Sequence, residues 1–301
     1  MLKPDEPIGF IGAGRTANTL ALAMHKAGYK IISIASQSYE SAASLALNIP
    51  GCSPKTSSLH VVETCKIVIM TVPDDSIKSV SAKLPWQKGQ GVIHCSGVLS
   101  LKPLESAEKK GAMIGSLHPY QTFPKGLDAT ASLPGSVFAI EGSEELKTWL
   151  GKLVKDLGCK AITISPKDRP LYHTAAVMGC GLLTTLIETT YGLWEIMGFS
   201  EKETKQAVLS LAKGTLRGME QQESGLVATG PITRGDVNTL KKHMEALAEN
   251  MPEALPLYQQ LGLRMVTLTL NKGSISDKQA TDMEIVLSAP SSPNSPGDTN
   301  K

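Results

Sequence analysis

Short apolar runs alternate with amphipathic stretches through the first half of the chain. Strands are predicted at residues 8–11, 31–35, 67–72, 91–95, 112–116, 136–140 and 160–164, with helices after the first strand and at residues 39–47, 76–84, 101–110 and 144–157. The run at 67–72, IVIMTV, is continuously apolar, which is typical of a strand buried on both faces. This alternation predicts an α/β fold, with a doubly wound Rossmann domain over residues 1–165.

The second half has a different pattern, because only helical periodicity is found there. Helices are predicted at residues 171–197, 201–222, 237–248 and 252–270. We therefore expect an all-helical domain over residues 166–287, which serves substrate binding and dimerisation. Residues 288–301 are rich in Pro, Ser, Asn and Gly, a composition that buries too little apolar surface to offset the entropy of ordering, so a disordered tail is predicted there.

Composition narrows the class of protein. The 301 residues are 41% hydrophobic and 19% charged, with a net charge of +2, so nothing indicates a nucleic acid or an anionic membrane as partner. The longest apolar stretch, residues 175–187, is too short to span a bilayer, and no leader-like segment opens the chain. Five cysteines without C-x-x-C spacing indicate reduced thiols, which predicts a cytoplasmic protein.

The segment GAGRTA, residues 12–17, lies between the first apolar run and an amphipathic stretch. In this strand–turn–helix context the pattern G-x-G-x-x-G/A indicates a dinucleotide site. Gly12 permits the tight turn, Gly14 lets a pyrophosphate approach the backbone, and Ala17 lets the helix pack closely on the strand. The helix N-terminus supplies free N–H groups, and Arg15 and Thr16 add a cation and a hydroxyl beside the phosphates.

The end of the second strand decides between NADP and NAD. An NAD site usually places a carboxylate there to accept a hydrogen bond from the ribose 2′-hydroxyl. Here the strand is followed by Ser36, Gln37 and Ser38, whose hydroxyls can donate to a 2′-phosphate. NADP is therefore favoured over NAD. The alternative is that these serines only cap the next helix.

Further polar groups follow the C-terminal ends of neighbouring strands. Val72 and Pro73 end the buried strand and turn the chain toward the edge where cofactors bind, and Ser96 and Gly97 follow the next strand. Asp74 and Asp75 come next to Pro73 and are candidates for ribose binding, although an Asp pair also starts a helix, and for Asp75 helix capping is favoured.

Two histidines occupy the same edge. His94 and His118 lie at adjacent strand ends, where a pair of imidazoles could serve as acid–base groups. The alternative is that each bonds backbone in a strand–loop turn. No third ligand stands at a characteristic spacing, so no metal site is predicted.

Several segments resemble a group of Rossmann-like oxidoreductases within the 6-phosphogluconate dehydrogenase and β-hydroxyacid dehydrogenase-like superfamily. The group carries a C-terminal helical domain of unknown function. The resemblance spans roughly residues 7–270 and rests on GAGRTA at 12–17, TVPDD at 71–75, HCSGVLS at 94–100, GSLHPYQTF at 115–123 and TGPITRGD at 229–236. More distant relatives include pyrroline-carboxylate, ketopantoate and deazaflavin-dependent NADP reductases.

The resemblance also implies where proton chemistry would lie. β-Hydroxyacid dehydrogenases carry a Lys and, one turn later, an Asn on their first long helix, but the corresponding positions here are Val177 and Gly181. His173, one turn before Val177, is the nearest ionisable substitute, and Tyr172 is the second. The alternative for His173 is a structural role at the start of the helix.

Arg234, in the segment TGPITRGD, has a guanidinium suited to a carboxylate or phosphate. It could hold an anionic substrate or the cofactor of a partner subunit, or it could pair with a glutamate. Asp236 is placed to cap the next helix.

Together these features predict a cytoplasmic NADP(H)-dependent oxidoreductase that transfers a hydride to or from a small carbonyl, hydroxyl or imine compound. Arg234 leaves open that this compound is anionic. A ketopantoate-reductase-like or deazaflavin-linked reductase is one alternative, and a non-catalytic NADP(H) sensor or interaction protein is another, favoured by the missing Lys and Asn. The long apolar helices predicted at 182–197 and 257–270, together with the resemblance, predict a homodimer.

Overall fold

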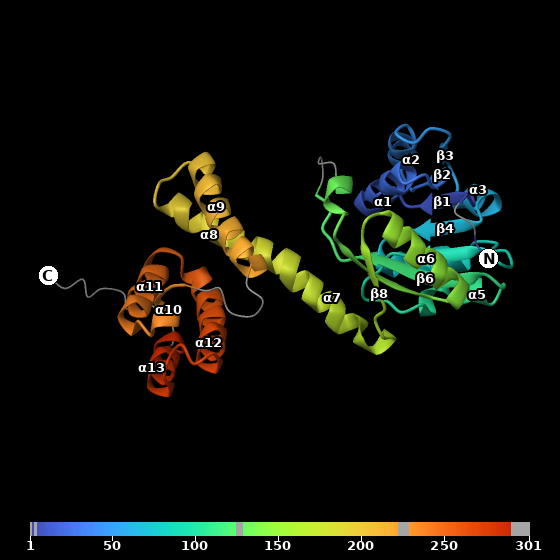
Figure 1. Ribbon diagram of the computed structural model, residues 1–301. Helices are drawn as coiled ribbons and strands as arrows, with labels where there is room; N and C mark the ends of the chain where they lie inside the picture. Colours follow the sequence, from blue (N-terminus) through green and yellow to red (C-terminus); the bar gives the residue numbers. More distant parts are fainter. Residues whose placement is uncertain (1, 3–4, 125–128, 222–228, 290–301) are drawn as a thin grey trace, which may run out of the picture. The chain divides into compact units, whose positions relative to one another are not determined.

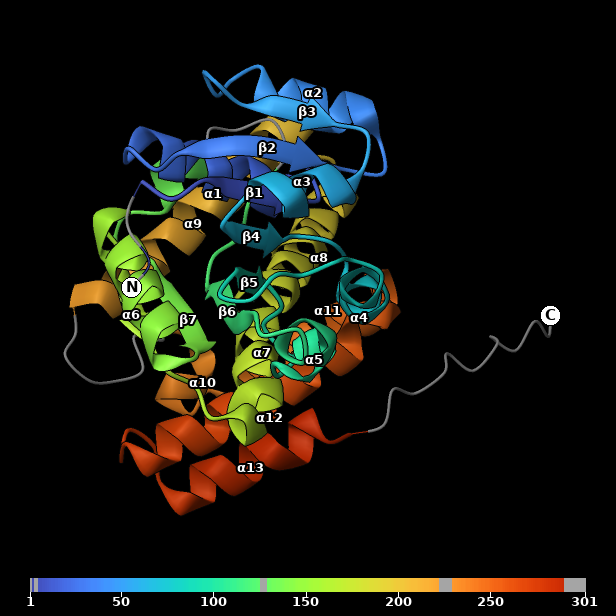
Figure 2. The same cartoon turned by 90° about the vertical axis from the view of Figure 1, so that its right-hand side faces the viewer.

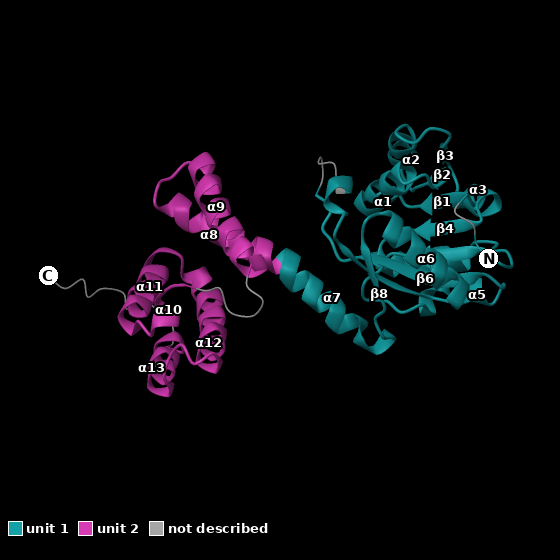
Figure 3. Ribbon diagram, viewed as in Figure 1, with its two compact units in different colours: residues 1–181 teal, residues 182–301 magenta. Residues whose placement is uncertain are grey.

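The computed structural model describes residue 2 and residues 5–124, 129–221 and 229–289. The chain divides into two compact units, residues 1–181 and residues 182–301, which are described separately (Figure 3).

The first unit is built on one eight-stranded sheet (Figures 1 and 2). Its strand order is β3-β2-β1-β4-β5-β6-β7-β8, and all neighbouring strands are parallel except β6 and β7. The strands are β1 (Ile8–Ile11), β2 (Ile31–Ala35), β3 (Ser53–Lys55), β4 (Ile67–Met70), β5 (Gly91–His94), β6 (Met113–Pro119), β7 (Val137–Gly142) and β8 (Lys160–Ile162).

Helices cover both faces of this sheet, and each face has its own hydrophobic core. One core contains α1 (Arg15–Lys26), α2 (Tyr39–Ala46) and α6 (Glu144–Asp156), and the other contains α3 (Ser58–Thr64), α4 (Asp74–Ala82) and α5 (Glu105–Glu108). Alternate residues of β4 enter opposite cores, with Ile67 and Ile69 in the first and Val68 and Met70 in the second. The predicted α/β fold class, doubly wound and followed by a helical region, is confirmed.

The strand order reverses between β1 and β4, since β2 and β3 extend the sheet on one side and β4 to β8 on the other. In open α/β sheets this switch point leaves a crevice outside the C-terminal ends of the strands, where ligands bind. The turn after β1 and the loops after β4 and β5 therefore lie where a dinucleotide is expected.

Local differences from the predicted elements have simple causes. β3 and α3 were not predicted, because a three-residue strand and a seven-residue helix carry too little periodicity to be recognised. The single helix predicted at 101–110 is a 3₁₀ turn, Lys102–Leu104, followed by the one-turn helix α5. Crossovers were expected throughout, yet β7 returns antiparallel to β6.

One long helical stretch carries the chain from the first unit into the second. It consists of a 3₁₀ turn (Pro166–Asp168), α7 (Arg169–Val177), a π-helical turn (Met178–Leu182) and α8 (Leu183–Ile196). Sheet gives way to helix next to the boundary expected at residues 165 and 166, whereas the compact units divide within the π-helical turn, between Gly181 and Leu182.

The helical stretch Pro166–Ile196 is also long and apolar enough, by length and composition alone, to cross a membrane. The apolar run at 175–187 is too short to span a bilayer, but the helix that contains it extends well beyond the run on both sides. The core helix of a water-soluble protein and a signal sequence meet the same criteria, so one such helix is weak evidence for a membrane span.

The second unit is helical throughout its described residues. Besides α8 it contains α9 (Glu201–Gln221), α10 (Pro231–Arg234), α11 (Val237–Asn250), a 3₁₀ turn (Pro252–Ala254), α12 (Leu255–Asn271) and α13 (Asp277–Leu287). Its main core gathers buried residues of α10 to α13, with Leu240, Val266, Met283 and Leu287 fully or almost fully buried. The tail predicted from residue 288 lies outside the described residues from 290 onward.

Candidate functional site

The glycine turn has the geometry that the fingerprint requires. Gly12 has a φ of +109°, and a Cβ at this position would lie 2.7 Å from the carbonyl oxygen of Thr71. Gly14 is the N-cap of α1 and no side chain caps the helix, so the first N–H groups of α1 are open to a ligand. Asn18 holds the turn by donating to the carbonyls of Ala13 and Gly14 at 3.0 and 2.9 Å.

Open space adjoins these N–H groups, because a Cβ built on Gly14 would meet no atom within 4 Å. Ala17 is fully buried, as expected for a helix packed closely on the sheet, while Arg15 is exposed and Thr16 half-buried in the first turn of α1. α1 has no acidic residue in its first turn that would repel a phosphate. These residues fit the pyrophosphate of a dinucleotide.

At the end of β2 the serines have separate roles. Ser38 is the N-cap of α2, accepting a hydrogen bond from the backbone N–H of Ser41 at 3.1 Å and donating to Glu40 at 2.9 Å. The capping role left open for Ser38 is therefore present, and its hydroxyl already donates to a carboxylate. Ser36 is half-buried at the strand end and is the serine better placed to serve a 2′-phosphate.

The turn after β4 is tied to the loop after β5. Val72 is half-buried, and Pro73 is exposed as the N-cap of α4, which begins at Asp74. Asp74 accepts a hydrogen bond of 2.6 Å from the buried hydroxyl of Ser96. Asp75 therefore lies within the first helical turn and does not cap the helix. Asp74 uses one carboxylate oxygen to fix the Ser96–Gly97 loop.

His94 is fully buried and bonds backbone through both ring nitrogens. Its Nδ1 accepts from the N–H of Ser96 at 3.2 Å, which leaves Nε2 to donate to the carbonyl of Ser100 at 3.1 Å. Burial, and to a lesser extent the charge of Arg169, lower the pKa of His94 from 6.5 to about 4. The structural alternative for His94 therefore fits the geometry better than an acid–base role.

His118, on β6, meets two residues of α7 in the first unit. Its Nδ1 lies 2.7 Å from the hydroxyl of Tyr172, and its ring lies edge-on to that of His173 with the centroids 6.1 Å apart. We call His118, Tyr172 and His173 the imidazole–phenol cluster. A Cβ on Gly97 would lie 2.7 Å from Nε2 of His118 and 2.8 Å from Cδ2 of His173, so this loop glycine borders both imidazoles.

His118 and Tyr172 are both neutral near physiological pH. Burial, followed by the nearby His173 and Arg169, lowers the pKa of His118 from 6.5 to about 4. Burial and the neighbouring Tyr120 raise the pKa of Tyr172 from 10.0 to about 12. When both side chains are neutral, one of them donates the hydrogen bond between them. The other keeps an N–H or O–H group that can donate to a ligand.

Arg169, which was not predicted, lies behind the cluster. Its side chain is 1% exposed and forms an ion pair of 2.7 Å with Glu141 on β7. It also donates to the hydroxyl of Ser116 on β6 and to the carbonyl of Ser96. Two signals in the sequence could have indicated this ion pair. The helix dipole disfavours a cation at the start of a helix, and a carboxylate is rare in an apolar strand.

Arg234 belongs to the second unit. It ends α10, is exposed, and has no ion pair of its guanidinium among the residues that the structure describes. Asp236 caps α11 as expected, accepting from the N–H of Thr239 at 3.1 Å. Whether Arg234 binds an anionic group stays a prediction.

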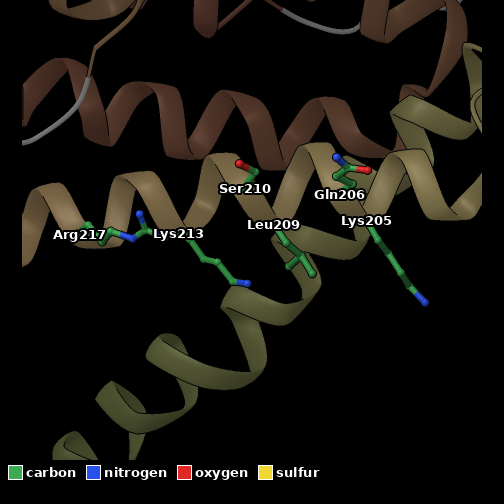
Figure 4. A pocket seen from close by; sticks show the side chains of 6 residues that line it. All are labelled: Lys205, Gln206, Leu209, Ser210, Lys213 and Arg217. Atoms are coloured by element: carbon green, nitrogen blue, oxygen red, sulfur yellow. The ribbon is translucent and has the colours of Figure 1, made fainter.

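Cavities also lie along α9. One, of about 490 Å³, is lined by Lys205, Gln206, Leu209, Ser210, Lys213 and Arg217 (Figure 4), and a second, of about 700 Å³, shares Gln206 and Ser210 with it. Lys205, Leu209 and Lys213 project from the same side of the helix. Neither cavity includes a predicted site residue. Among the described residues, no group of three or more His, Cys, Asp or Glu could hold a metal.

Two family models match the chain. The family described as "NADP oxidoreductase coenzyme F420-dependent" matches residues 7–97, which include the glycine turn and end at Gly97. A domain of unknown function, DUF2520, matches residues 136–265, which include Arg169, Tyr172 and His173. The imidazole–phenol cluster thus borders the end of the first match at Gly97 and takes two of its residues from the second.

Several solved structures with the same fold are described as oxidoreductases or reductases. A proposed NADP oxidoreductase from Bacteroides fragilis is 24% identical with a TM-score of 0.74, covering 88% of this chain and 99% of its own. A 1-pyrroline-5-carboxylate reductase from Streptococcus pyogenes is 17% identical with a TM-score of 0.60, covering 94% and 100%. A reductive aminase from Aspergillus terreus, solved with NADPH, is 14% identical with a TM-score of 0.59, covering 94% and 92%.

At these identities the structural likeness establishes the fold. The comparison with curated proteins finds no significant match. NADP as the dinucleotide is supported by the family match at residues 7–97. Residues 7–97 thus match a family of NADP oxidoreductases and residues 136–265 match a domain of unknown function, the combination that the sequence motifs resemble.

Proposed function

We propose that this protein is a cytoplasmic NADP(H)-dependent reductase acting on a small compound with a C=N or C=O bond. The observation that carries the proposal is the imidazole–phenol cluster, which borders Gly97 in the loop after β5, on the C-terminal side of the sheet that also carries the glycine turn. A dinucleotide-binding edge thus has proton-handling side chains beside it.

The N-terminal residues would hold the dinucleotide. Gly12, Gly14 and the first turn of α1 would bind the pyrophosphate, Arg15 and Ser36 the 2′-phosphate, and the loops at Val72–Pro73 and Ser96–Gly97 would border the nicotinamide end. Bound NADPH would supply the hydride.

The cluster would supply the proton. Tyr172 carries its proton at neutral pH, because its pKa is raised to about 12. Hydrogen bonding from His118 would orient the phenol, or the phenol would orient His118 so that Nε2–H faces the substrate. His173 lies beside both and is the third candidate donor. A positioned donor of this kind contributes about 10²–10⁴-fold to turnover.

The substrate class is inferred from the neutral pair of His118 and Tyr172 and from the fold. A neutral donor pair stabilises negative charge that develops on oxygen, and it can protonate nitrogen after hydride addition. Pyrroline-carboxylate reductases and reductive aminases with this fold support an imine or carbonyl substrate. Arg234, exposed on the second unit, would bind an anionic part of the substrate or of the cofactor of a partner subunit.

The test measures NADPH oxidation with a panel of cyclic imines, keto acids (ketopantoate included) and a deazaflavin acceptor. We expect turnover with at least one imine or keto acid, and a loss of about 10²-fold or more in Tyr172→Phe, His118→Ala or His173→Ala with NADPH affinity within a few-fold. The matched control is His60→Ala, an exposed histidine on α3, which should behave as the parent protein.

The second candidate is a non-catalytic NADP(H) sensor, which is favoured by Val177 and Gly181 standing where relatives carry Lys and Asn. Tight NADPH binding without turnover on any acceptor would establish the sensor. Absence of NADPH binding would refute both candidates.

A further inference from the structure

Arg169 is the largest fully buried side chain of the described residues, and its charge is completely engaged. Nε donates to Glu141 Oε2 at 2.9 Å and Nη2 lies 2.7 Å from the same oxygen. Nη2 also donates to the hydroxyl of Ser116, and Nη1 donates to the carbonyl of Ser96 at 3.4 Å. A buried guanidinium is stable only when it is paired and hydrogen-bonded in this way.

These partners come from three neighbouring segments of the sheet. Ser116 and Glu141 stand directly opposite each other in the antiparallel β6–β7 pair, and Ser96 belongs to the loop after β5. Arg169 itself is the first residue of α7. The planar guanidinium of Arg169 therefore links the start of α7 to two strands and a loop through hydrogen bonds. A lysine, with its single nitrogen, could not make this set of bonds.

The helix that this guanidinium anchors carries two of the three cluster residues. Tyr172 and His173 follow Arg169 at i+3 and i+4, so all three lie on the same side of the first turn of α7. The Ser96 carbonyl that Arg169 binds is also adjacent to Gly97, the glycine that borders the imidazoles of His118 and His173. Arg169 therefore begins the helix that carries Tyr172 and His173, and its guanidinium also binds the loop that borders the cluster.

We propose that Arg169 is the positioning residue of the site: through Glu141, Ser116 and the Ser96 carbonyl it sets the first turn of α7 so that Tyr172 and His173 meet His118. The chemistry served by this arrangement rests on the proposed function. The positioning of Tyr172 and His173 by Arg169 does not depend on the proposed function, because it concerns contacts within the first unit alone.

The electrostatics agree with this role. Burial is the main cause of the lowered pKa of His118, and its neighbours His173 and Arg169 lower it further. The ionisable groups around His118 are Tyr172, His173 and Arg169 from α7 and His94 from β5, while the carboxylate of Glu141 on β7 is held by Arg169. If the first turn of α7 moves away, His118 loses its cover and its pKa returns toward 6.5.

The experiment follows the ring protons of His118 by NMR over pH, and measures NADPH affinity and turnover in the same variants. In Arg169→Lys we expect the His118 titration midpoint to rise by about one pH unit or more. NADPH affinity should stay within a few-fold, since Arg169 does not contact the glycine turn that follows β1. Turnover should fall by about 10²-fold, the usual cost of a small misplacement. Glu141→Gln and Ser116→Ala should shift the midpoint in the same direction by less.

The matched control is Val62→Ala, which opens a cavity under α3, in the core on the opposite face from α6. It should lower the melting temperature without moving the His118 midpoint. An unchanged midpoint in folded Arg169→Lys would overturn the proposal, as would an equal shift in Val62→Ala. If Arg169→Lys does not fold, an unchanged midpoint in Glu141→Gln and Ser116→Ala overturns it instead. Absence of any turnover would refute the proposed function and leave the NMR result to decide on Arg169.

Discussion

Glycine serves opposite purposes at the two ends of the phosphate turn. Gly12 is needed for its backbone, because its φ of +109° and the 2.7 Å approach of a Cβ to the Thr71 carbonyl both exclude a side chain. Gly14 has an ordinary φ of −75°, and a side chain there would meet no protein atom within 4 Å. The fold therefore requires Gly12, whereas only a ligand would require Gly14.

This contrast gives a clean test of the dinucleotide site. Gly14→Val should leave the melting temperature nearly unchanged and abolish NADPH binding measured by calorimetry, because the side chain occupies the space beside the N–H groups of α1. Gly12→Val should unfold or strongly destabilise the domain. NADPH affinity that survives in Gly14→Val would remove the glycine turn from cofactor binding.

Gly97 is the corresponding position beside the cluster. In Gly97→Ala the new methyl group would have to displace the rings of His118 and His173, so turnover should fall at least about tenfold while NADPH affinity changes less. Gly214→Ala, on α9, is the control, since a Cβ there meets nothing within 4 Å. Parent-like turnover in Gly97→Ala would show that the contact with the imidazoles is unimportant.

His94 makes stability depend on pH. Its pKa is about 4 in the folded protein and near 6.5 when unfolded, so between these values the unfolded chain binds more protons. The contribution is fully present above pH 6.5 and is lost as the pH falls to about 4, on the order of 3 kcal/mol in the free energy of unfolding. Denaturant titrations should show this loss in the parent and less of it in His94→Gln. Equal pH dependence in both would contradict the buried neutral ring.

At the scale of elements, the end of β2 separates two uses of serine. Ser38 is committed to the N-cap of α2 and to Glu40, whereas Ser36 is half-buried without such a role. We therefore expect the preference for NADP over NAD to depend on Ser36 and Arg15 rather than on the whole loop.

Ser36→Asp should weaken NADPH binding by charge repulsion with the 2′-phosphate and weaken NADH binding much less, by calorimetry with both nucleotides. Ser41→Asp, on the exposed first turn of α2, is the control for added charge. Tighter binding of NADH than of NADPH by the parent protein would contradict the predicted preference.

Elements differ in how far the sequence predicts them. The β1–turn–α1 unit was predictable because its signals lie within about twenty residues of one another, and β1 and β2 were placed residue for residue. His118, Tyr172 and His173 were each recognised as candidates, but their contact depends on how α7 docks on β6, which no local pattern encodes. Arg169 was missed for the same reason, since its partners are distant in sequence.

At the scale of the whole molecule, apolar side chains remain exposed on the helices of the second unit. Leu211 is 73%, Met219 58% and Leu216 50% exposed on α9, and Leu182 is 54% and Met197 61% exposed at the ends of α8. Surfaces of this kind usually form interfaces. We expect them to be covered by a second copy of the chain.

Light scattering at micromolar concentration should therefore give the mass of a homodimer. Leu211→Glu combined with Leu216→Glu should shift the protein to monomer, because two buried carboxylates would be unpaired in the interface. Glu220→Lys, an exposed change on the same helix, should leave the mass unchanged. A monomeric parent protein would contradict the predicted dimer.

The π-helical turn at Met178–Leu182 has a consequence for comparing this chain with its relatives. A π turn accommodates about one residue more than an α turn, so every side chain after it is rotated by about 100° relative to an uninterrupted helix. Relatives whose long helix is purely α-helical would match this chain up to Val177 and then differ by one position. The position equivalent to that Asn is accordingly expected at Leu182 rather than at Gly181, and a leucine cannot exchange a proton either. Alignments of the family should place a single-residue gap at this turn.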